Sequence, residues 1–315
     1  MQIDHCLILS AGFGTRMGEI GKSLPKVLWP IFEKTLLELQ VEYAKSIGAK
    51  KIYINLHHQK DLILNFTKNK SAFEDVTFLV EDEILDIGGG IHNLASNVGY
   101  KGKLLVLNAD QFFLMPKDFV EASLKKLSRS PVLLFSYQVD PRLGYNCLEL
   151  TSENTLKAIV PAAELKNTSS GVTYTGISLI DLSKLTPHPG KSSFFESVAR
   201  FTETDVLVEG VGNIDYWDFG TAQRYWLTMR RVISTYKVNS VHPFLRFLVN
   251  SKALKSWKIN HNHLSYHSSG LEVIHLGLNQ DNSNSQKVIS LTDHSFKNVV
   301  GPAIIFDKIE EKISL

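Results

Sequence analysis

The sequence predicts an α/β fold with a Rossmann-like, mostly parallel sheet that carries helices on both faces. Across residues 1–140, short aliphatic runs alternate with segments of helical periodicity, which is typical of parallel strands joined by helical crossovers. Of the 315 residues, 43% are apolar, which is enough for a large core. Strand-like runs dominate residues 146–210 and indicate a smaller antiparallel part. Residues 236–315 change to short apolar runs between polar turns.

The periodicity of the chain sets the expected order of elements. Strands are predicted at 5–10, 51–56, 76–82, 103–110 and 131–139, and helices at 34–47, 59–67 and 116–127. In the second half, strands are predicted at 147–150, 156–160, 174–180 and 205–210, with helices at 194–200 and 221–234. Because ligands bind at the carboxyl ends of strands in such sheets, the loops there are the first candidates for a functional site.

The chain is expected to divide into a main domain, residues 1–235, and a C-terminal appendage, residues 236–315. The apolar runs of the appendage, LEVIHLGL, KVISL and NVVGPAIIF, are too short for a core of their own. We therefore expect them to pack as strands against the main domain or against a second subunit of a homo-oligomer. The run VVGPAIIF also resembles one coil of a short β-helix.

Charge and hydropathy narrow the range of partners. The 34 basic and 32 acidic residues are mixed along the chain and give a formal charge of +2, so nucleic acid is not an expected partner. The sequence has no apolar run near the roughly 20 residues that span a bilayer, and its first residues, MQIDHCLILSAG, do not fit a signal peptide. We expect a cytoplasmic protein without a membrane partner.

A glycine-bearing loop directly follows the first strand. The strand HCLILS runs into AGFGTRMG, so backbone N–H groups are presented at a strand end, where they suit phosphate oxygens. The dinucleotide fingerprint G-x-G-x-x-G fails at Met17, and the P-loop pattern that would end at Gly21, Lys22 and Ser23 fails at Arg16. Two cations, Arg16 and Lys26, lie close to the loop in sequence, and this charge suits a triphosphate.

These residues resemble the opening signature of the sugar-phosphate nucleotidyltransferase family, A-G-x-G-T-R-M followed by P-K-x-L-x-P. The segments IYINLHHQKDLILNF, VEDEILDIGGGIHNL, KLLVLNAD and YWDFGT resemble the same family in the same order, so the resemblance covers residues 1 to about 230. It implies a glycosyltransferase-A-like fold with a nucleotide-binding half, residues 1–140, and a sugar-binding part, residues 141–220. Within the family, N-acetylmuramate 1-phosphate uridylyltransferases are most similar, with mannose- and heptose-1-phosphate guanylyltransferases close behind.

The resemblance implies transfer of a nucleotidyl group to a sugar 1-phosphate with release of pyrophosphate. Two anions meet in this reaction, so catalysis depends on charge neutralisation and alignment. Mg²⁺ prefers oxygen ligands and keeps several waters, so two carboxylates suffice for the protein's share of a site. Asp110, at the end of the strand KLLVLNA, and Asp218, in W-D-F-G-T, are the expected ligands. Arg16 and Lys26 are the expected catalytic cations.

The remaining site residues follow from the same resemblance. The expected nucleotide-binding residues are Leu9, Ala11, Gly12, Gly14, Thr15, Arg16, Lys26, Asn108 and the loop glycines Gly88 and Gly89. The resemblance places Gly144, Asn146 and Gly176 near the sugar, and Glu164 is a further candidate that would replace an acid of the family. The family's Glu-Lys-Pro appears here as Ile159, Val160 and Pro161, which removes an acid and a lysine and leaves the identity of the sugar open.

The base is expected to be uracil, because the triple glycine followed by Ile91 and His92 is most like the uridylyltransferases. GTP stays an alternative, because Glu81, Asp82 or Glu83 can accept hydrogen bonds from guanine. A noncatalytic sugar-nucleotide sensor is a further alternative. The retention of both cations and both aspartates argues against it.

Overall fold

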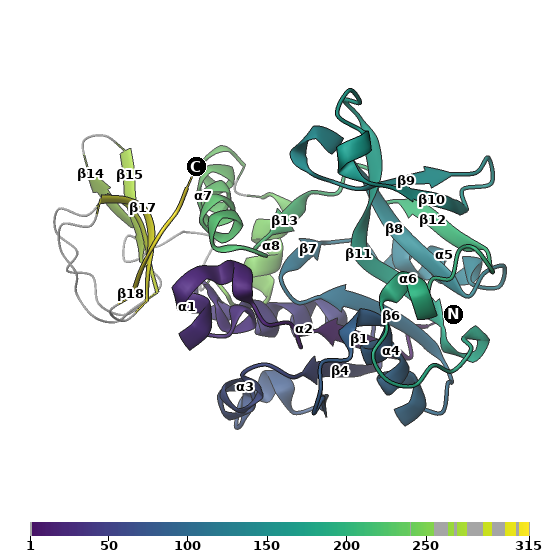
Figure 1. Ribbon diagram of the computed structural model, residues 1–315. Helices are drawn as coiled ribbons and strands as arrows, with labels where there is room; N and C mark the ends of the chain where they lie inside the picture. Colours follow the sequence, from purple (N-terminus) through teal and green to yellow (C-terminus); the bar gives the residue numbers. More distant parts are fainter. Residues whose placement is uncertain are drawn as a thin grey trace.

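The computed structural model describes residues 2–239, 241–254, 264–267, 270–275, 286–291, 300–306 and 309–314. Its centre is a seven-stranded sheet in which six strands run in one direction and one runs antiparallel to both neighbours (Figure 1). In spatial order the strands are β12 (Val206–Gly210), β8 (Val132–Val139), β11 (Gly171–Asp181), β6 (Lys103–Asn108), β1 (His5–Leu9), β4 (Lys51–Leu56) and β5 (Val76–Val80). The predicted mostly parallel sheet is confirmed, with β11 as its antiparallel strand.

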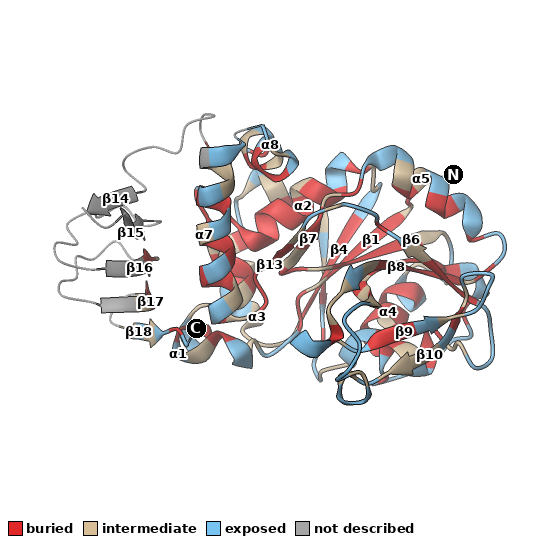
Figure 2. Ribbon diagram, turned by 90° about the horizontal axis from the view of Figure 1, so that it is seen from above, coloured by how far each residue is buried: buried red, intermediate tan, exposed pale blue. Residues whose placement is uncertain are grey.

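Helices cover both faces of this sheet. On one face α2 (Leu36–Ser46), α3 (Lys60–Thr67) and α5 (Lys117–Lys126) share a core cluster with the strands, and on the other face α4 (Asp86–Asn97) and α6 (Phe194–Ser197) share a second cluster. Successive residues of β1 enter the two clusters in turn, because side chains alternate across a strand. Figure 2 shows the buried residues concentrated in the central strands and on the sides of the helices that face them.

Two runs that were expected in the smaller antiparallel part belong to the central sheet. They form most of β11 and β12, because most of their side chains are apolar and are buried on both faces of the sheet. The separate antiparallel pair is therefore smaller than expected and consists of β9 (Cys147–Leu150) and β10 (Leu156–Val160).

A second small ladder, formed by β7 (Gln111–Phe113) and β13 (Tyr216–Asp218), lies beyond the end of β6. Helix α2 holds β7 in place through two buried side chains. The Gln40 side chain donates to the Gln111 carbonyl at 2.6 Å, and the Tyr43 hydroxyl donates to the Phe113 carbonyl at 2.7 Å. A strand of three residues would be marginal alone, and these bonds tie it to the sheet-facing helix.

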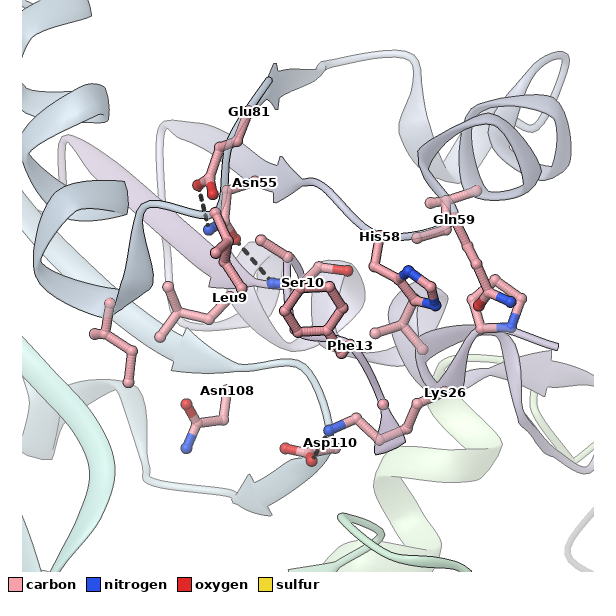
Figure 3. Close-up of a pocket in the computed structure, with 18 of the residues that line it drawn as sticks. Leu9, Ser10, Phe13, Lys26, Asn55, His58, Gln59, Glu81, Asn108 and Asp110 are labelled. Carbon is pink, nitrogen blue, oxygen red and sulfur yellow. Dashed lines mark hydrogen bonds and ion pairs between the residues drawn. The ribbon is translucent and has the colours of Figure 1, made fainter. Parts of the chain in front are cut away.

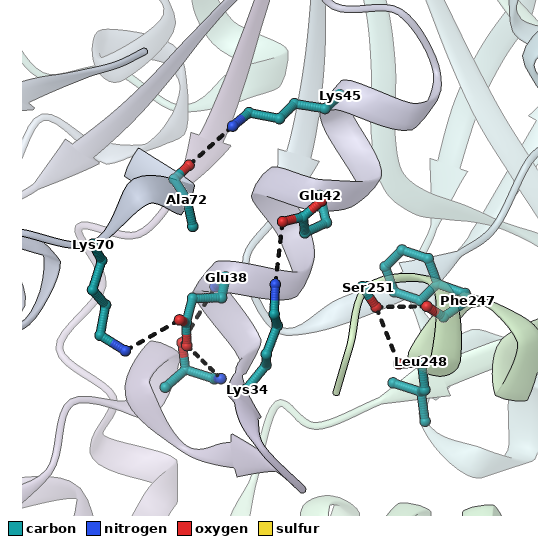
Figure 4. A network of polar contacts seen from close by, with 10 residues as sticks. Lys34, Glu38, Glu42, Lys45, Lys70, Ala72, Phe247, Leu248 and Ser251 are labelled. Carbon is teal, nitrogen blue, oxygen red and sulfur yellow. Dashed lines mark hydrogen bonds and ion pairs between the residues drawn. The ribbon is translucent and has the colours of Figure 1, made fainter. Parts of the chain in front are cut away.

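Helix α2 is itself fixed at its N-terminus, after a hairpin of β2 (Pro30–Ile31) and β3 (Lys34–Thr35). Thr35 and Glu38 form a capping box, in which each side chain accepts from the other residue's backbone N–H. Lys70 donates to Glu38 at 3.1 Å and Lys34 to Glu42 at 3.2 Å (Figure 4). These contacts bind α2 to the segment before β5 and to the hairpin.

The chain continues after β13 into α7 (Ala222–Val238) and α8 (Pro243–Asn250). A five-stranded sheet lies beside α7 and α1 (Gly18–Ser23) (Figure 1). Its strands are β14 (Leu264–His267), β15 (Gly270–His275), β16 (Gln286–Ser290), β17 (Val300–Phe306) and β18 (Ile309–Lys312). The parallel order of β15, β16 and β17 is compatible with the expected β-helix-like coil, which stays a prediction. Residues 276–278 and 298–299 of the expected runs lie outside the described residues.

The C-terminal sheet packs on the main domain of the same chain. Ile289, Ile304 and Ile313 are buried in a cluster with residues of α7 and α8. The Glu311 carboxylate accepts from the Glu19 backbone N–H at 2.9 Å, and it occupies the space that a Cβ on Gly18 would need. The last strand therefore contacts the helix that directly follows the glycine-bearing loop. None of the helices in the described part of the chain is long and apolar enough to cross a bilayer.

Helix α8 supports the β7–β13 ladder from outside. The Phe244 ring stacks on the Trp217 ring with centroids 4.3 Å apart, and both side chains are buried. Phe244→Ala should therefore lower the free energy of unfolding by about 3–5 kcal/mol, because it opens a cavity against Trp217. Val241→Ala, at an exposed position just before α8, is the control and should change it by less than about 0.5 kcal/mol. Urea unfolding of the two variants measures this, and equal losses would contradict the packing role of Phe244.

Candidate active site

Two cavities meet at the carboxyl ends of β1 and β6. The first, which we call the loop cavity, has a volume of about 350 Å³ and is lined by residues 9–14 together with Arg16, Lys26, Asn55, Glu81 and Asp110. The second, which we call the aromatic cavity, has a volume of about 420 Å³ and is lined by three tyrosines of the strands, Tyr137, Tyr174 and Tyr216, and by Tyr145, Phe194 and Phe195. Leu9, Asp86, Ile87, Asn108 and Gln111 line both cavities. Two ligands can therefore occupy adjacent positions here.

The glycine-bearing loop forms one wall of the loop cavity. Gly14 has φ 64°, a left-handed conformation that favours glycine, and the chain then enters a 3-10 turn at Thr15–Met17. Most of the expected nucleotide-binding residues line this cavity: Leu9, Ala11, Gly12, Gly14, Arg16, Lys26 and Asn108. Thr15 is exposed and is not among the lining residues.

Gly88 and Gly89 lie elsewhere than expected. They are in the first turns of α4 rather than in a loop. Neither is among the residues that line the loop cavity or the aromatic cavity. The Gly89 N–H donates to the Ser192 carbonyl at 3.1 Å, and a Cβ on Gly88 would lie 2.3 Å from the Ser193 carbonyl oxygen. Their lack of side chains serves close packing of α4 on the segment before α6. This differs from the expected contact with base and ribose.

The register of the β7–β13 ladder brings the two expected metal ligands together. Asp218 pairs with Gln111, the neighbour of Asp110, and the Phe219 N–H donates to the Asp110 carbonyl at 2.9 Å. One carboxylate oxygen of each aspartate lies 3.0 Å from the position that a Cβ on Gly220 would take. The two oxygens are therefore separated by no more than twice that distance. Both aspartates are largely buried.

Each carboxylate is paired with a cation. Lys26 Nζ lies 2.5 Å from Asp110 Oδ2, and the two side chains point toward each other in Figure 3. Asp218 Oδ2 accepts from Arg224 and from the Tyr216 hydroxyl, both at 2.6 Å. Its Oδ1 accepts from the Gly220 N–H at 2.8 Å. Asp110 lines the loop cavity, and the Asp218 partners Tyr216 and Arg224 line the aromatic cavity, so the charge of each buried carboxylate is balanced beside a cavity.

Burial and the nearby Asp218 carboxylate shift the pKa values of Tyr216 and Arg224. They raise the pKa of Tyr216 well above its ordinary value, so its hydroxyl stays a donor. Burial alone disfavours the charge of Arg224, but the Asp218 carboxylate raises its pKa above the ordinary value, so the guanidinium stays charged. In the part of the chain that the structure describes, three or more His, Cys, Asp or Glu side chains do not gather as a metal cluster.

A chain of hydrogen bonds forms the far wall of the loop cavity (Figure 3). Asn55 Oδ1 accepts from the Ser10 N–H at 2.8 Å, and Asn55 Nδ2 donates to Glu81 Oε1 at 2.8 Å. Burial raises the pKa of Glu81, while its bonds from Asn55 and from the Leu85 N–H act in the opposite direction. Asn55 was missed from the sequence, although a polar residue near the end of a buried strand is a signal for such a site.

The expected sugar-binding residues are not all brought together. Gly176 lines the aromatic cavity, has φ 81° and leaves room for the Asn108 side chain. Gly144 and Asn146 are not among the lining residues, and Asn146 Oδ1 accepts from the Ala162 N–H instead. Glu164 is exposed in the turn that follows β10. The six aromatic side chains and Arg224, which do line the cavity, were missed from the sequence.

Comparisons with known proteins agree with this geometry. Residues 5–234 match the model of the nucleotidyl transferase family. The chain is 31% identical over 150 residues to a D-glycero-alpha-D-manno-heptose 1-phosphate guanylyltransferase of Campylobacter jejuni, which covers 48% of this chain and 65% of that protein. It is 27% identical over 211 residues to the bifunctional protein GlmU of Marinobacter nauticus. This aligned region covers 66% of this chain and 44% of that protein. The chain thus spans less than two thirds of each relative.

Solved structures share the fold at lower identity. HddC from Yersinia pseudotuberculosis, complexed with GMP-PN, has a TM-score of 0.59 and 22% identity, over 73% of this chain and 100% of that one. UDP-glucose pyrophosphorylase complexed with UDP-glucose has a TM-score of 0.59 and 16% identity, over 74% of this chain and 100% of that one. Because the family model matches most of the chain, the protein belongs to the nucleotidyl transferase family.

Proposed function

We propose that the protein joins a sugar 1-phosphate to the α-phosphate of a nucleoside triphosphate. An oxygen of the sugar phosphate attacks the α-phosphorus, the bond from that phosphorus to the bridging oxygen breaks, and pyrophosphate leaves with this oxygen. The observation that carries the proposal is the pair of buried carboxylates beside two adjoining cavities: Asp110 lines the loop cavity, and Asp218 bonds Arg224, which lines the aromatic cavity. The loop cavity would hold the triphosphate and the aromatic cavity the sugar phosphate.

Catalysis would depend on the cations and backbone donors of the loop cavity. Lys26 and Arg16 line this cavity, where they can offset charge on the phosphates of the nucleotide and of the departing pyrophosphate. Gly12 and Gly14 let phosphate oxygens approach the backbone closely. Asn108 lines both cavities and can orient the two substrates toward each other.

Asp110 and Asp218 fit a Mg²⁺ ion as its protein ligands. Their oxygens are hard donors, and the absence of a side chain at Gly220 leaves the space beside both of them open. When bound, the ion would neutralise charge on the phosphates of both substrates. Lys26 and Arg224 contact the carboxylates in the structure, and each has further N–H donors for phosphate oxygens.

We infer that GTP is the preferred nucleotide, against the expectation of UTP from the sequence. Glu81 is buried and lines the loop cavity, and each oxygen of an ionised carboxylate has a second lone pair beside the one used by Asn55 or by the Leu85 N–H, so it can accept from the N1–H and the N2 amino group of guanine. The expectation of UTP depended on the resemblance of the triple glycine with Ile91 and His92 to the uridylyltransferases, and Gly88 and Gly89 of that segment pack on the residues before α6. UTP with N-acetylmuramate 1-phosphate is the competing assignment, and mannose or heptose 1-phosphate is the sugar that we pair with GTP.

The metal assignment predicts a loss of turnover without a loss of fold. Asp110→Asn and Asp218→Asn should each lower kcat by at least about 100-fold, because each removes a negative ligand from a site with two. Asp118→Asn removes an exposed carboxylate from the first turn of α5 and should leave kcat unchanged. Pyrophosphate release at saturating Mg²⁺ measures kcat, and thermal unfolding checks the fold. Near-normal turnover in either aspartate variant would contradict the assignment of Asp110 and Asp218 as Mg²⁺ ligands.

The nucleotide assignment predicts a base-dependent thermal shift. With Mg²⁺, GTP should raise the Tm of the protein more than UTP at equal concentration, because a ligand of the native state stabilises it according to concentration over Kd. Glu81→Gln should reduce the GTP shift and leave the UTP shift, because an amide cannot accept from both guanine donors. Glu74→Gln, at an exposed position that does not line the loop cavity, is the control. A larger shift with UTP in the unmodified protein would restore the uridylyl assignment.

A further inference from the structure

The aromatic cavity contains a single basic side chain among its lining residues, that of Arg224. Its other walls are tyrosine and phenylalanine rings and uncharged polar groups, apart from Asp86 at the edge shared with the loop cavity. Aromatic rings can cover the apolar faces of a sugar, but they do not balance a phosphate dianion. A sugar phosphate bound here therefore needs a cation, and Arg224 is the one that this wall supplies.

The place of Arg224 in its helix is not explained by helix stability. It lies in the first turn of α7, where the helix macrodipole disfavours a cation, and this first turn contains no acidic residue. Its described side-chain bond, to Asp218 Oδ2, uses one of the five N–H donors of a guanidinium. The side chain is 40% exposed, whereas that of Asp218 is 10% exposed. Donors of Arg224 therefore remain for a ligand in the cavity.

Two other positions could have supplied a cation to the aromatic cavity, and neither does. Val160, at the end of β10, is half-buried and is not among the lining residues of the aromatic cavity. Lys26 lines the loop cavity and bonds Asp110 there. The two cations thus serve different cavities, and each is held beside one of the two carboxylates.

We propose that Arg224 binds the phosphate group of the sugar 1-phosphate and holds it next to Asp218. This inference deepens the proposed function and rests on it. The guanidinium can form two parallel hydrogen bonds to a phosphate, and its bond to Asp218 fixes the plane in which it presents them. Arg224 would thereby select a phosphorylated sugar over the parent sugar and position the attacking oxygen.

The test compares binding of phosphorylated and parent sugars, so it does not require turnover. Mannose 1-phosphate and mannose, and glucose 1-phosphate and glucose, are titrated calorimetrically into the full chain with Mg²⁺ and a nonhydrolysable GTP or UTP analogue. The unmodified protein should prefer a phosphorylated sugar, and Arg224→Gln should lower that preference about tenfold or more. Arg224→Lys should restore part of it. Arg230→Gln, which removes an arginine of α7 that lies over the Trp226 ring and does not line the aromatic cavity, should keep it.

A second readout separates phosphate binding from an indirect effect through Asp218. In steady-state kinetics, Arg224→Gln should raise KM for the sugar 1-phosphate about tenfold or more while KM for the nucleoside triphosphate stays within about twofold. An equal rise in both KM values, or an unchanged preference for the phosphorylated sugar, would overturn the inference. If the unmodified protein binds sugar phosphates selectively but releases no pyrophosphate with any of them, the proposed function fails while the role of Arg224 stands.

Discussion

The antiparallel pairing of β7 with β13 is the constraint on which the rest of the site depends. Its register places Asp218 opposite Gln111 and so brings Asp110 and Asp218, which lie far apart in sequence, to the two sides of Gly220. A three-residue ladder cannot hold this arrangement by itself. The buried side chains of α2 fix β7 by its carbonyls, and the stack of Phe244 on Trp217 fixes β13. The core helices thus determine the separation of the two carboxylates.

This arrangement creates a balanced charge at the point where the cavities join. Lys26 neutralises Asp110 from the loop cavity, and Arg224 neutralises Asp218 from the aromatic cavity. Buried carboxylates without partners would be costly, so the pairing also stabilises the fold before any ligand binds. Phosphate groups entering from either side meet a cation that is already oriented. Asp110 and Asp218 would hold Mg²⁺, which would add positive charge beside the phosphates, and the remaining donors of Lys26 and Arg224 give the proposed reaction the rest of its electrostatic basis.

The parts of the site that could be predicted from the sequence are those formed by residues close together in the chain. The glycine-bearing loop, Lys26 and Asp110 follow directly from one strand end and one short signature, and the structure brings them into one cavity. Gly88 and Gly89 lie in a helix rather than in the expected loop, because glycine allows close approach equally in a ligand loop and in helix packing. The aromatic wall was missed because its members come from separate strands and loops, and aromatic residues in strands are usually interpreted as core. Arg224 was missed for the same reason: only the fold places the first turn of α7 against that wall.

The most direct measurement is an anomalous diffraction map from crystals of the full chain grown with Mn²⁺ and a nonhydrolysable GTP or UTP analogue. Mn²⁺ accepts the same carboxylate and phosphate ligands as Mg²⁺ and can be located without ambiguity. The account predicts an anomalous peak that is coordinated by one oxygen of Asp110, one oxygen of Asp218 and phosphate oxygens of the analogue. A metal ion bound to the analogue but to neither aspartate, or to residues of another cavity, would contradict the claim that the β7–β13 register builds the catalytic site.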